Sequence, residues 1–240
     1  MSKGVRGILF DAGNTLVYID PVRMVEIFRA EGVEVDTEGF RAAELDARRV
    51  IHEGAGAGSR GTEPELWLAY FVDLFKRNGA SGRTADRIGR RVRREHAADH
   101  LWTHALPGTA EVLESLKTAG YRIGVISNAD GRMEGALETA GVRGHFEFVI
   151  DSAVIGIEKP QPEIFRAGCD ALGLAAHECL YVGDLYEVDY VGATAAGLHA
   201  LLIDPLGFHG QRAETVSTLS QIREWLHDHG RRSSDASHEA

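Results

Sequence analysis

Residues 8–16 read ILFDAGNTL, a short apolar strand pattern that stops at the carboxylate of Asp11. Residues 181–189 read YVGDLYEVD and repeat this pattern, with the strand stopping before Asp184. Ligands of a parallel α/β sheet bind at the carboxyl ends of its strands, so acids that follow two distant strands would meet there. The two stretches therefore predict an α/β fold whose chemistry lies at one edge of the sheet.

The composition limits the class of protein. The 240 residues, 44% of them hydrophobic, are enough to bury a full core. A net charge of −10 disfavours binding to nucleic acid or to a membrane surface. No run approaches membrane-spanning length, the first strand follows without an apolar signal core, and only two cysteines are present. We expect a cytoplasmic monomer or homodimer with no nucleic-acid or membrane partner.

The strand and helix alternation is interrupted early in the chain. After a strand at residues 5–10, helical patterns cover residues 21–32, 36–51, 63–77 and 84–102, with no strand pattern among them. From residue 107 the alternation returns, with strands at 122–127, 146–150, 179–182 and 199–203 and helices between them, the last at 218–229. We expect a core from residues 1–18 and 106–230, a helical insertion at 19–105, and a disordered tail at 231–240.

The acid that follows the first strand suits covalent chemistry. A carboxylate attacks phosphorus when it is held in line and nearby cations offset the negative charge, so we interpret Asp11 as the nucleophile. Thr15, four residues on in a tight turn, would fix that turn with its hydroxyl and bond Asp11.

The second set of acids predicts a metal site. Asp184 would bring Mg²⁺ into contact with Asp11 and a phosphate oxygen, because magnesium prefers a few hard oxygen ligands. Asp189 would support that site, or would instead cap the helix that follows it. Such carboxylates repel one another unless a divalent cation and a lysine are present, and Lys159 is the available lysine.

Two further segments would bind the substrate. Ser127 ends a strand, and its hydroxyl with the following amides of Asn128 and Ala129 would hold phosphate oxygens. Arg60, in a glycine-rich loop of the insertion, would pair with a substrate carboxylate or a second phosphate. The expected partner is a small phosphorylated molecule.

Taken in order, these segments resemble the four motifs of the haloacid dehalogenase-like hydrolases, in the branch with a helical cap after the first motif. The matching segments are Asp11 to Thr15, Ser127-Asn128, Lys159-Pro160, and Gly183 to Asp189. The resemblance implies a Rossmann-like parallel sheet with a helical cap, and a Mg²⁺-dependent phosphatase that works through an aspartyl-phosphate. It also implies that Asp11, Asp184 and the main-chain carbonyl of Gly13 hold the metal.

Gly13 departs from the family pattern. Typical phosphatases of the family carry a second aspartate there, which protonates the leaving group, and such general acid catalysis is worth about 10² to 10⁴ in rate. The loss of this aspartate would leave a slow enzyme, an enzyme specialised for good leaving groups, or an enzyme whose general acid comes from the cap or the substrate. Asn14, the next residue, tolerates the left-handed geometry of a tight turn.

The missing aspartate leaves two alternatives open. Dehalogenases of the family also lack it, but they need no metal and usually replace the Gly-Asp pair of the fourth motif, so Gly183-Asp184 favours a phosphatase. A weakly active protein that binds a phosphometabolite is the other alternative.

Three features of the insertion have simpler interpretations. His96, His100 and His104 recur every four residues, and we interpret them as an interfacial or solvated row rather than as metal ligands. The arginines of residues 83–94 cover most of a helix and suggest a solvated face. Four aromatic residues at helical spacing suggest the core of the insertion: Trp67, Tyr70, Phe71 and Phe75.

Overall fold

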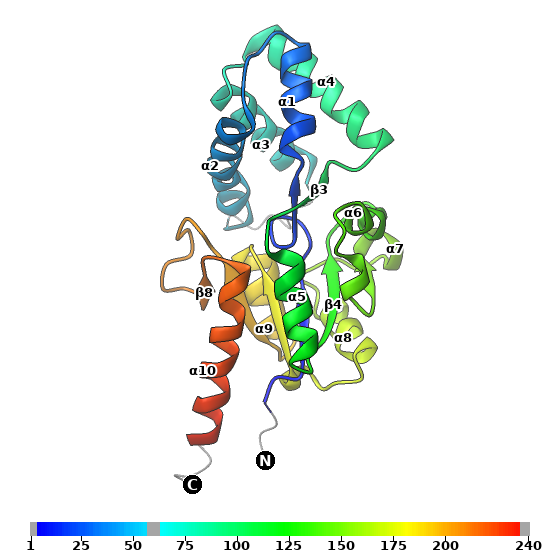
Figure 1. Cartoon of the computed structure of the whole chain (residues 1–240), viewed down its shortest axis with the longest axis vertical. Coiled ribbons are helices and arrows are strands. Elements are labelled where there is room, and N and C mark those ends of the chain that lie inside the picture. The colour runs from blue at the N-terminus through cyan, green and yellow to red at the C-terminus, as the bar shows by residue number, and fades with distance from the viewer. Residues whose placement is uncertain (1–3, 57–62, 236–240) are drawn as a thin grey trace.

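The computed structural model of the protein describes residues 4–56 and 63–235. Figure 1 shows a sheet with helices packed against it, and a separate group of helices beyond one end of the strands. Within the described residues the main sheet has six parallel strands in the order β5-β4-β1-β6-β7-β8. Its strands are β1 (Gly7–Phe10), β4 (Arg122–Ser127), β5 (Val149–Asp151), β6 (Cys179–Gly183), β7 (His199–Ile203) and β8 (Thr215–Val216). The predicted α/β fold is confirmed.

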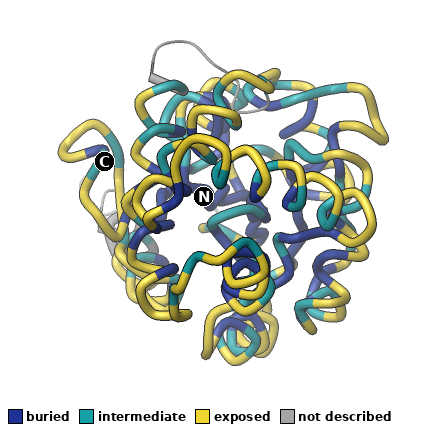
Figure 2. Tube along the Cα trace, turned by 90° about the horizontal axis from the view of Figure 1, so that it is seen from above, coloured by how far each residue is buried: buried dark blue, intermediate teal, exposed yellow. Residues whose placement is uncertain are grey.

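Alternating residues of each strand pack into two apolar layers, one on each face of the sheet, because successive side chains of a strand point to opposite faces. The helices that follow the insertion are α5 (Thr109–Thr118), α6 (Met133–Thr139), α7 (Ser152–Ile155), α8 (Pro162–Ala171), α9 (Val191–Ala195) and α10 (Ile222–Asp235). In β1, Ile8 and Phe10 pack with α5, α6 and α10, whereas Leu9 packs with α8 and α9 on the other face. Figure 2 shows the buried segments toward the middle of the molecule and exposed turns around the rim.

The insertion forms a helical group with a core of its own. Its helices are α1 (Pro21–Ala30), α2 (Thr37–Gly56), α3 (Pro64–Arg77) and α4 (Gly82–Ala98). The Asp20 carboxylate accepts hydrogen bonds from the amides of Val22 and Arg23, and Pro21 is the first helical residue, so α1 begins where the sequence predicts. The separate core supports our proposal that residues 19–105 form a cap domain.

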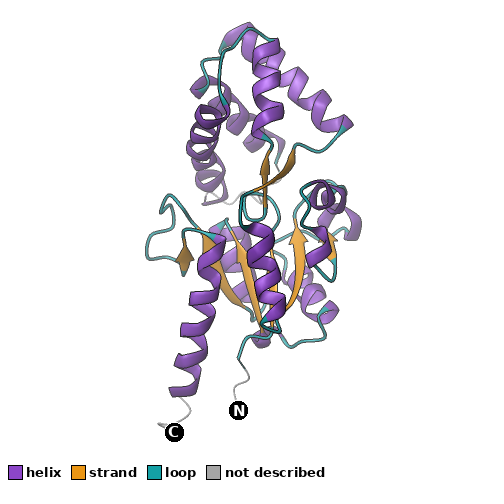
Figure 3. Cartoon of the chain, viewed as in Figure 1, coloured by secondary structure: helices purple, strands orange, loops and turns teal. Residues whose placement is uncertain are grey.

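A two-stranded antiparallel sheet connects the helical group to the main sheet. It pairs β2 (Val17–Ile19) with β3 (Trp102–Ala105), and Figure 3 shows both strands between the two parts. The prediction that residues 84–102 are helical, with no strand in the insertion, was wrong at this end. Helix α4 ends at Ala98, and Asp99 is already extended, because the next residues pair with a strand far away in the sequence.

The carboxyl-terminal region differs from the prediction in one respect. Helix α10 continues to Asp235 rather than ending at His229, so residues 231–235 are helical and not a disordered tail. The rest of that expected tail, residues 236–240, lies outside the described residues. None of the helices in the described part of the chain is long and apolar enough to span a bilayer.

Candidate active site

Neighbouring strands of the main sheet bring the predicted site residues together. Asp11 follows β1, Ser127 ends β4 and Asp184 follows β6, and both β4 and β6 pair with β1. All three side chains are buried and line one cavity of about 420 Å³ between the sheet and the helical group. The convergence of distant acids expected from the two strand patterns is therefore present in the fold.

Lys159 is the centre of the buried polar network. Its Nζ donates to Asp11 Oδ1 at 2.6 Å, to Asp189 Oδ1 at 2.7 Å and to the Tyr181 hydroxyl at 2.9 Å. Although burial opposes its charge, Asp11 and Asp189 raise the pKa of Lys159 well above its ordinary value. Lys159 therefore stays protonated and offsets the charge of the two carboxylates.

Asn128 and Tyr181 hold this lysine in place. The Asn128 amide group accepts from the Lys159 N–H at 2.8 Å and donates to the Lys159 carbonyl at 3.0 Å. The Asn128 side chain thus positions the lysine, and phosphate binding by its main-chain amide stays a prediction. The Tyr181 hydroxyl donates to the Ile126 carbonyl, and sequence reasoning missed this contact.

Asp189 fixes the loop that carries Asp184. While its Oδ1 accepts from Lys159, its Oδ2 accepts from the amides of Asp184 at 3.1 Å and Leu185 at 2.9 Å. Asp189 lies within a short π-helix, Tyr186–Tyr190, and does not cap the following helix. Asp189 therefore supports Asp184 indirectly, through the backbone of the loop.

Gly183 is required by the close approach of Asp189. A Cβ on Gly183 would lie 2.4 Å from Asp189 Cγ and 2.5 Å from its Oδ2. We expect Gly183→Ala to lower the free energy of unfolding by about 1–3 kcal/mol, because the buried carboxylate must move away from its amides. Gly135→Ala, in α6 where a Cβ meets no atom within 4 Å, is the matched control and should be neutral or stabilising. Urea unfolding measures both, and equal stability of the two variants would contradict this role of Gly183.

The carboxylates create a site of excess negative charge. Burial raises the pKa of Asp11 to about 6, with Asp189 adding to the rise and Lys159 opposing it. Burial, Asp189 and Asp11 raise the pKa of Asp184 well above its ordinary value. Oxygens of the three acids lie within 4.8 Å of one another, yet Asp184 makes no salt bridge to any residue that the structure describes. This donor set is suited to a divalent cation.

The turn after Asp11 differs from its prediction at one residue. Asn14 has a φ of +55°, as expected for the left-handed region. The Thr15 hydroxyl, however, is buried without a hydrogen-bond partner among the described residues, so the predicted bond to Asp11 is not formed. The turn is closed instead by main-chain bonds from Leu16 and Val17 to the Ala12 carbonyl.

The phosphate-binding predictions have different outcomes. Ser127 is buried and lines the cavity, so its hydroxyl remains a candidate ligand for phosphate. The Ala129 amide instead donates to the Ser152 hydroxyl at 3.2 Å, and the expected cradle loses that donor. Arg60 lies outside the described residues.

The helical group supplies the far wall of the cavity. Trp67 and Phe71 of α3 line it together with Trp102 of β3, whereas Tyr70 and Phe75 are buried in the core of the group. Trp67 and Phe71 are partly buried and pack against the same core, so all four aromatic residues belong to it as predicted, and these two also line the cavity. Arg93 is exposed, in agreement with the predicted solvated face, and it also lines the cavity.

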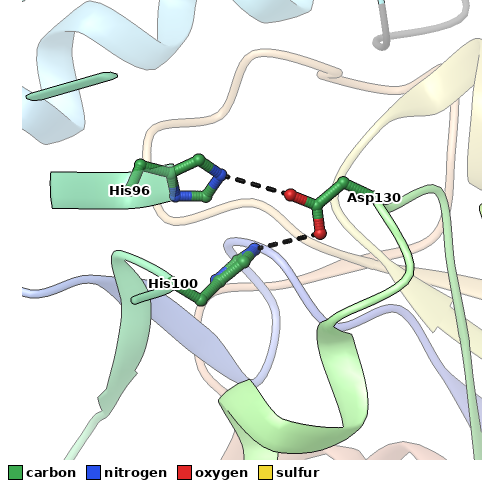
Figure 4. Close-up of side chains that lie close together, drawn as sticks. All are labelled: His96, His100 and Asp130. Carbon is green, nitrogen blue, oxygen red and sulfur yellow. Dashed lines mark ion pairs between the residues drawn. The ribbon is translucent and has the colours of Figure 1, made fainter. Parts of the chain in front are cut away.

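Two of the three histidines meet an acid at the cavity wall. His96 Nε2 lies 3.4 Å from Asp130 Oδ2, and His100 Nε2 lies 3.9 Å from Asp130 Oδ1 (Figure 4). His104 lies apart on β3, where it contacts Arg41. The histidines do not form a single row, because α4 ends before His100. Asp130 was missed, and its only sequence signal is its place just after Ser127-Asn128.

Comparison with known proteins agrees with the fold and the site. A family model described as haloacid dehalogenase-like hydrolase matches residues 5–197. A human protein, haloacid dehalogenase-like hydrolase domain-containing protein 3, is 36% identical over 183 residues, which cover 73% of this chain and 71% of the human protein. The chain belongs to the haloacid dehalogenase-like hydrolases, and it is therefore a hydrolase.

Two further matches bear on the fold and on the chemistry. The crystal structure of a HAD phosphatase from Thermococcus onnurineus matches with a TM-score of 0.59 and 24% identity, covering 92% of this chain and 98% of that one. Ribulose-1,5-bisphosphate 5-phosphatase of Halopiger xanaduensis is 29% identical over 211 residues, 82% of this chain and 84% of the relative. The first match supports the fold alone.

Proposed function

We propose that this protein is a Mg²⁺-dependent phosphatase that hydrolyses a small phosphorylated metabolite through a covalent intermediate on Asp11. The observation that carries the proposal is the buried lysine bridge between Asp11 and Asp189, beside the unpaired carboxylate of Asp184. The similarity to a sugar-bisphosphate phosphatase supports the same class of substrate. The cytoplasmic location and the monomeric or dimeric state stay predictions.

The chain's own residues supply the nucleophile and the charge stabilisation for the two chemical steps. Asp11 attacks phosphorus, so that a bond from its carboxylate oxygen to phosphorus forms while the bond from phosphorus to the leaving-group oxygen breaks. Lys159 holds Asp11 in position and offsets charge on the phosphoryl group. The Ser127 hydroxyl would donate to a phosphate oxygen at the cavity floor. Water then attacks the aspartyl-phosphate, releasing phosphate and restoring Asp11.

The residues present fit a magnesium ion. The carboxylates of Asp11 and Asp184 and the carbonyl of Gly13 are hard oxygen donors, and the buried Asp184 carboxyl forms no salt bridge to any side chain that the structure describes. When bound, Mg²⁺ would neutralise phosphate charge during transfer. Asp189 would keep the Asp184 loop in the geometry that this requires.

The metal requirement gives a first test of the proposal. We expect hydrolysis of a phosphometabolite panel to need Mg²⁺ and to stop in EDTA. Asp184→Ala should raise the Mg²⁺ concentration for half-maximal rate by about tenfold or more, since it removes one of few protein ligands. Asp170→Ala, an exposed acid on α8, is the matched control and should keep the wild-type Mg²⁺ response.

Two results would replace the proposal with one of its alternatives. Full activity in EDTA, with halide released from a 2-haloacid, would identify a dehalogenase, the alternative that Gly13 favours. Binding of phosphate esters without turnover under any metal condition would identify a phosphometabolite-binding protein.

A further inference from the structure

A main-chain amide fixes the hydrogen position on His100. The Leu101 N–H donates to His96 Nδ1, and the Trp102 N–H donates to His100 Nδ1, both at 3.2 Å. A ring nitrogen that accepts a hydrogen bond carries no hydrogen, so the neutral His100 ring carries its hydrogen on Nε2. Burial, with the neighbouring His96, lowers the pKa of His100 to about 4, and the ring is therefore neutral near pH 7.

The two oxygens of Asp130 have different partners. Oδ2 accepts from the guanidinium of Arg132 and lies beside His96 Nε2. Oδ1 has no hydrogen-bond donor within range in the described part of the chain, since its neighbour His100 Nε2 is 3.9 Å away. Burial raises the pKa of Asp130, but the contact with Arg132 outweighs burial and lowers it. The carboxylate is therefore ionised, and its Oδ1 can accept a hydrogen bond.

His100 Nε2–H and Asp130 Oδ1 thus form a donor and an acceptor that face each other across a gap (Figure 4). The gap is too wide for a direct hydrogen bond, and it suits one oxygen atom that bonds both. Both residues line the same cavity as Asp11. A hydroxyl group accepts and donates at once, whereas a carboxylate would be repelled by Asp130 and an ammonium group could not accept from His100.

We propose that His100 and Asp130 bind a hydroxyl group of the leaving group, and so select a phosphate ester of a hydroxylated carbon chain, such as a polyol or sugar. This inference rests on the phosphatase function proposed above and names its substrate class. Trp67 and Trp102 line the same cavity with ring centroids 5.3 Å apart, and they give the C–H faces of such a chain an apolar wall.

The same side chains have the composition of a transition-metal site, but their hydrogen bonds oppose that role. A metal-bound imidazole needs its lone pair on Nε2 and donates its other N–H to an acceptor. Here His100 Nδ1 accepts from an amide, which leaves its hydrogen on Nε2. The Arg132 guanidinium also lies 3.1 Å from His96 Nε2 and would repel a cation.

The test compares two replacements of His100. Asparagine keeps an acceptor near the Nδ1 position and lacks the Nε2–H donor, whereas glutamine places an N–H near Nε2. The probes are ribitol 5-phosphate, which has a hydroxyl on each of the four carbons that do not carry the phosphate, and pentyl phosphate, which has none. We expect the ratio of their kcat/KM values to fall about tenfold in His100→Asn and to be largely kept in His100→Gln. Comparing this ratio between variants cancels the different leaving-group acidities.

A second variant and a binding measurement keep the inference separate from the proposed function. Asp130→Ala, at a half-exposed position that should tolerate truncation, is expected to lose the preference as His100→Asn does. In the non-reacting Asp11→Asn background, calorimetry should show the same loss in affinity for ribitol 5-phosphate relative to pentyl phosphate. If the wild-type protein hydrolyses neither ester but this binding preference is present, the phosphatase proposal fails and the hydroxyl site stands.

The hydroxyl site is overturned if the ratio is unchanged in both His100→Asn and Asp130→Ala. Stoichiometric Zn²⁺ binding that His100→Asn abolishes would also overturn it, because the lone pair would then lie on Nε2.

Discussion

Replacing Asp11 by asparagine is expected to abolish hydrolysis of every phosphate ester, a loss of about four orders of magnitude or more, while the protein stays folded. Asparagine has nearly the same size and can still accept from Lys159 Nζ, but its amide oxygen cannot act as the nucleophile. Steady-state kinetics measures the loss. Beryllofluoride, which mimics the phosphoryl group on a carboxylate, should protect the wild-type protein against thermal unfolding and fail to protect the variant. Turnover at the wild-type rate would rule out the covalent mechanism.

The same substitution has an expected effect on stability. Burial raises the pKa of Asp11 from 3.8 to about 6, so the folded state binds this proton more tightly than the unfolded chain does. The wild-type protein therefore loses stability as the pH rises through this interval, and a neutral asparagine does not. In EDTA, we expect the melting temperature of Asp11→Asn to exceed that of wild type at pH 7, and the difference to shrink toward pH 4. A variant that melts lower at pH 7 would show that the carboxylate stabilises the fold.

The floor of the site, formed by the residues at the carboxyl ends of the strands, could be predicted from the sequence because local patterns determine it. An apolar run of four to five residues that stops at an acid identifies both a buried strand and its carboxyl end, as with Asp11 and Asp184. The parallel sheet then brings these ends together without further information. The pairing of β1 with both β4 and β6 is a property of the whole fold, yet the strand patterns alone were sufficient to expect the cluster.

The far wall of the cavity could not be predicted in this way. Asp130 and His100 are close only because the helical group lies over the carboxyl ends of the strands. His100 lies between the end of α4 and the start of β3, and its position depends on the pairing of β3 with β2. Neither residue ends an apolar run, and the regular histidine spacing suggested a single helix. Pairing between distant strands overrode that local pattern.

The hydrogen bonds made by individual residues of the floor could not be predicted from local sequence patterns either. Tyr181 is one strand residue among several in a buried strand, and its hydroxyl reaches the Lys159 ammonium group only in the folded structure. Thr15 has the right distance along the chain to bond Asp11, but its hydroxyl direction depends on how the turn closes through the Ala12 carbonyl. Spacing restricts which residues are near one another, whereas their hydrogen bonds depend on backbone torsions.

Restoring an acid at position 13 is expected to raise the rate on poor leaving groups. An alkoxide needs a proton as it departs, whereas an aryloxide or acyl leaving group needs one much less. The wild-type rate should therefore fall steeply as the leaving-group pKa rises, and aryl and acyl phosphates should be better substrates than alkyl phosphates. Gly13→Asp should raise turnover of alkyl phosphates by up to about 10² to 10⁴ and change aryl phosphates little.

The geometry at Gly13 makes this experiment feasible. Gly13 is not among the glycines with positive φ, a Cβ built on it meets no heavy atom within 4 Å, and the residue lines the cavity beside Asp11. Gly13→Asn is the matched control, because it has the same shape without an acidic proton and should give no gain. Rates are compared across an aryl and alkyl phosphate series under single-turnover conditions, where chemistry limits the rate. A wild-type rate independent of leaving-group pKa would mean that another group already supplies the proton, and Glu158, which also lines the cavity, would be the next residue to replace.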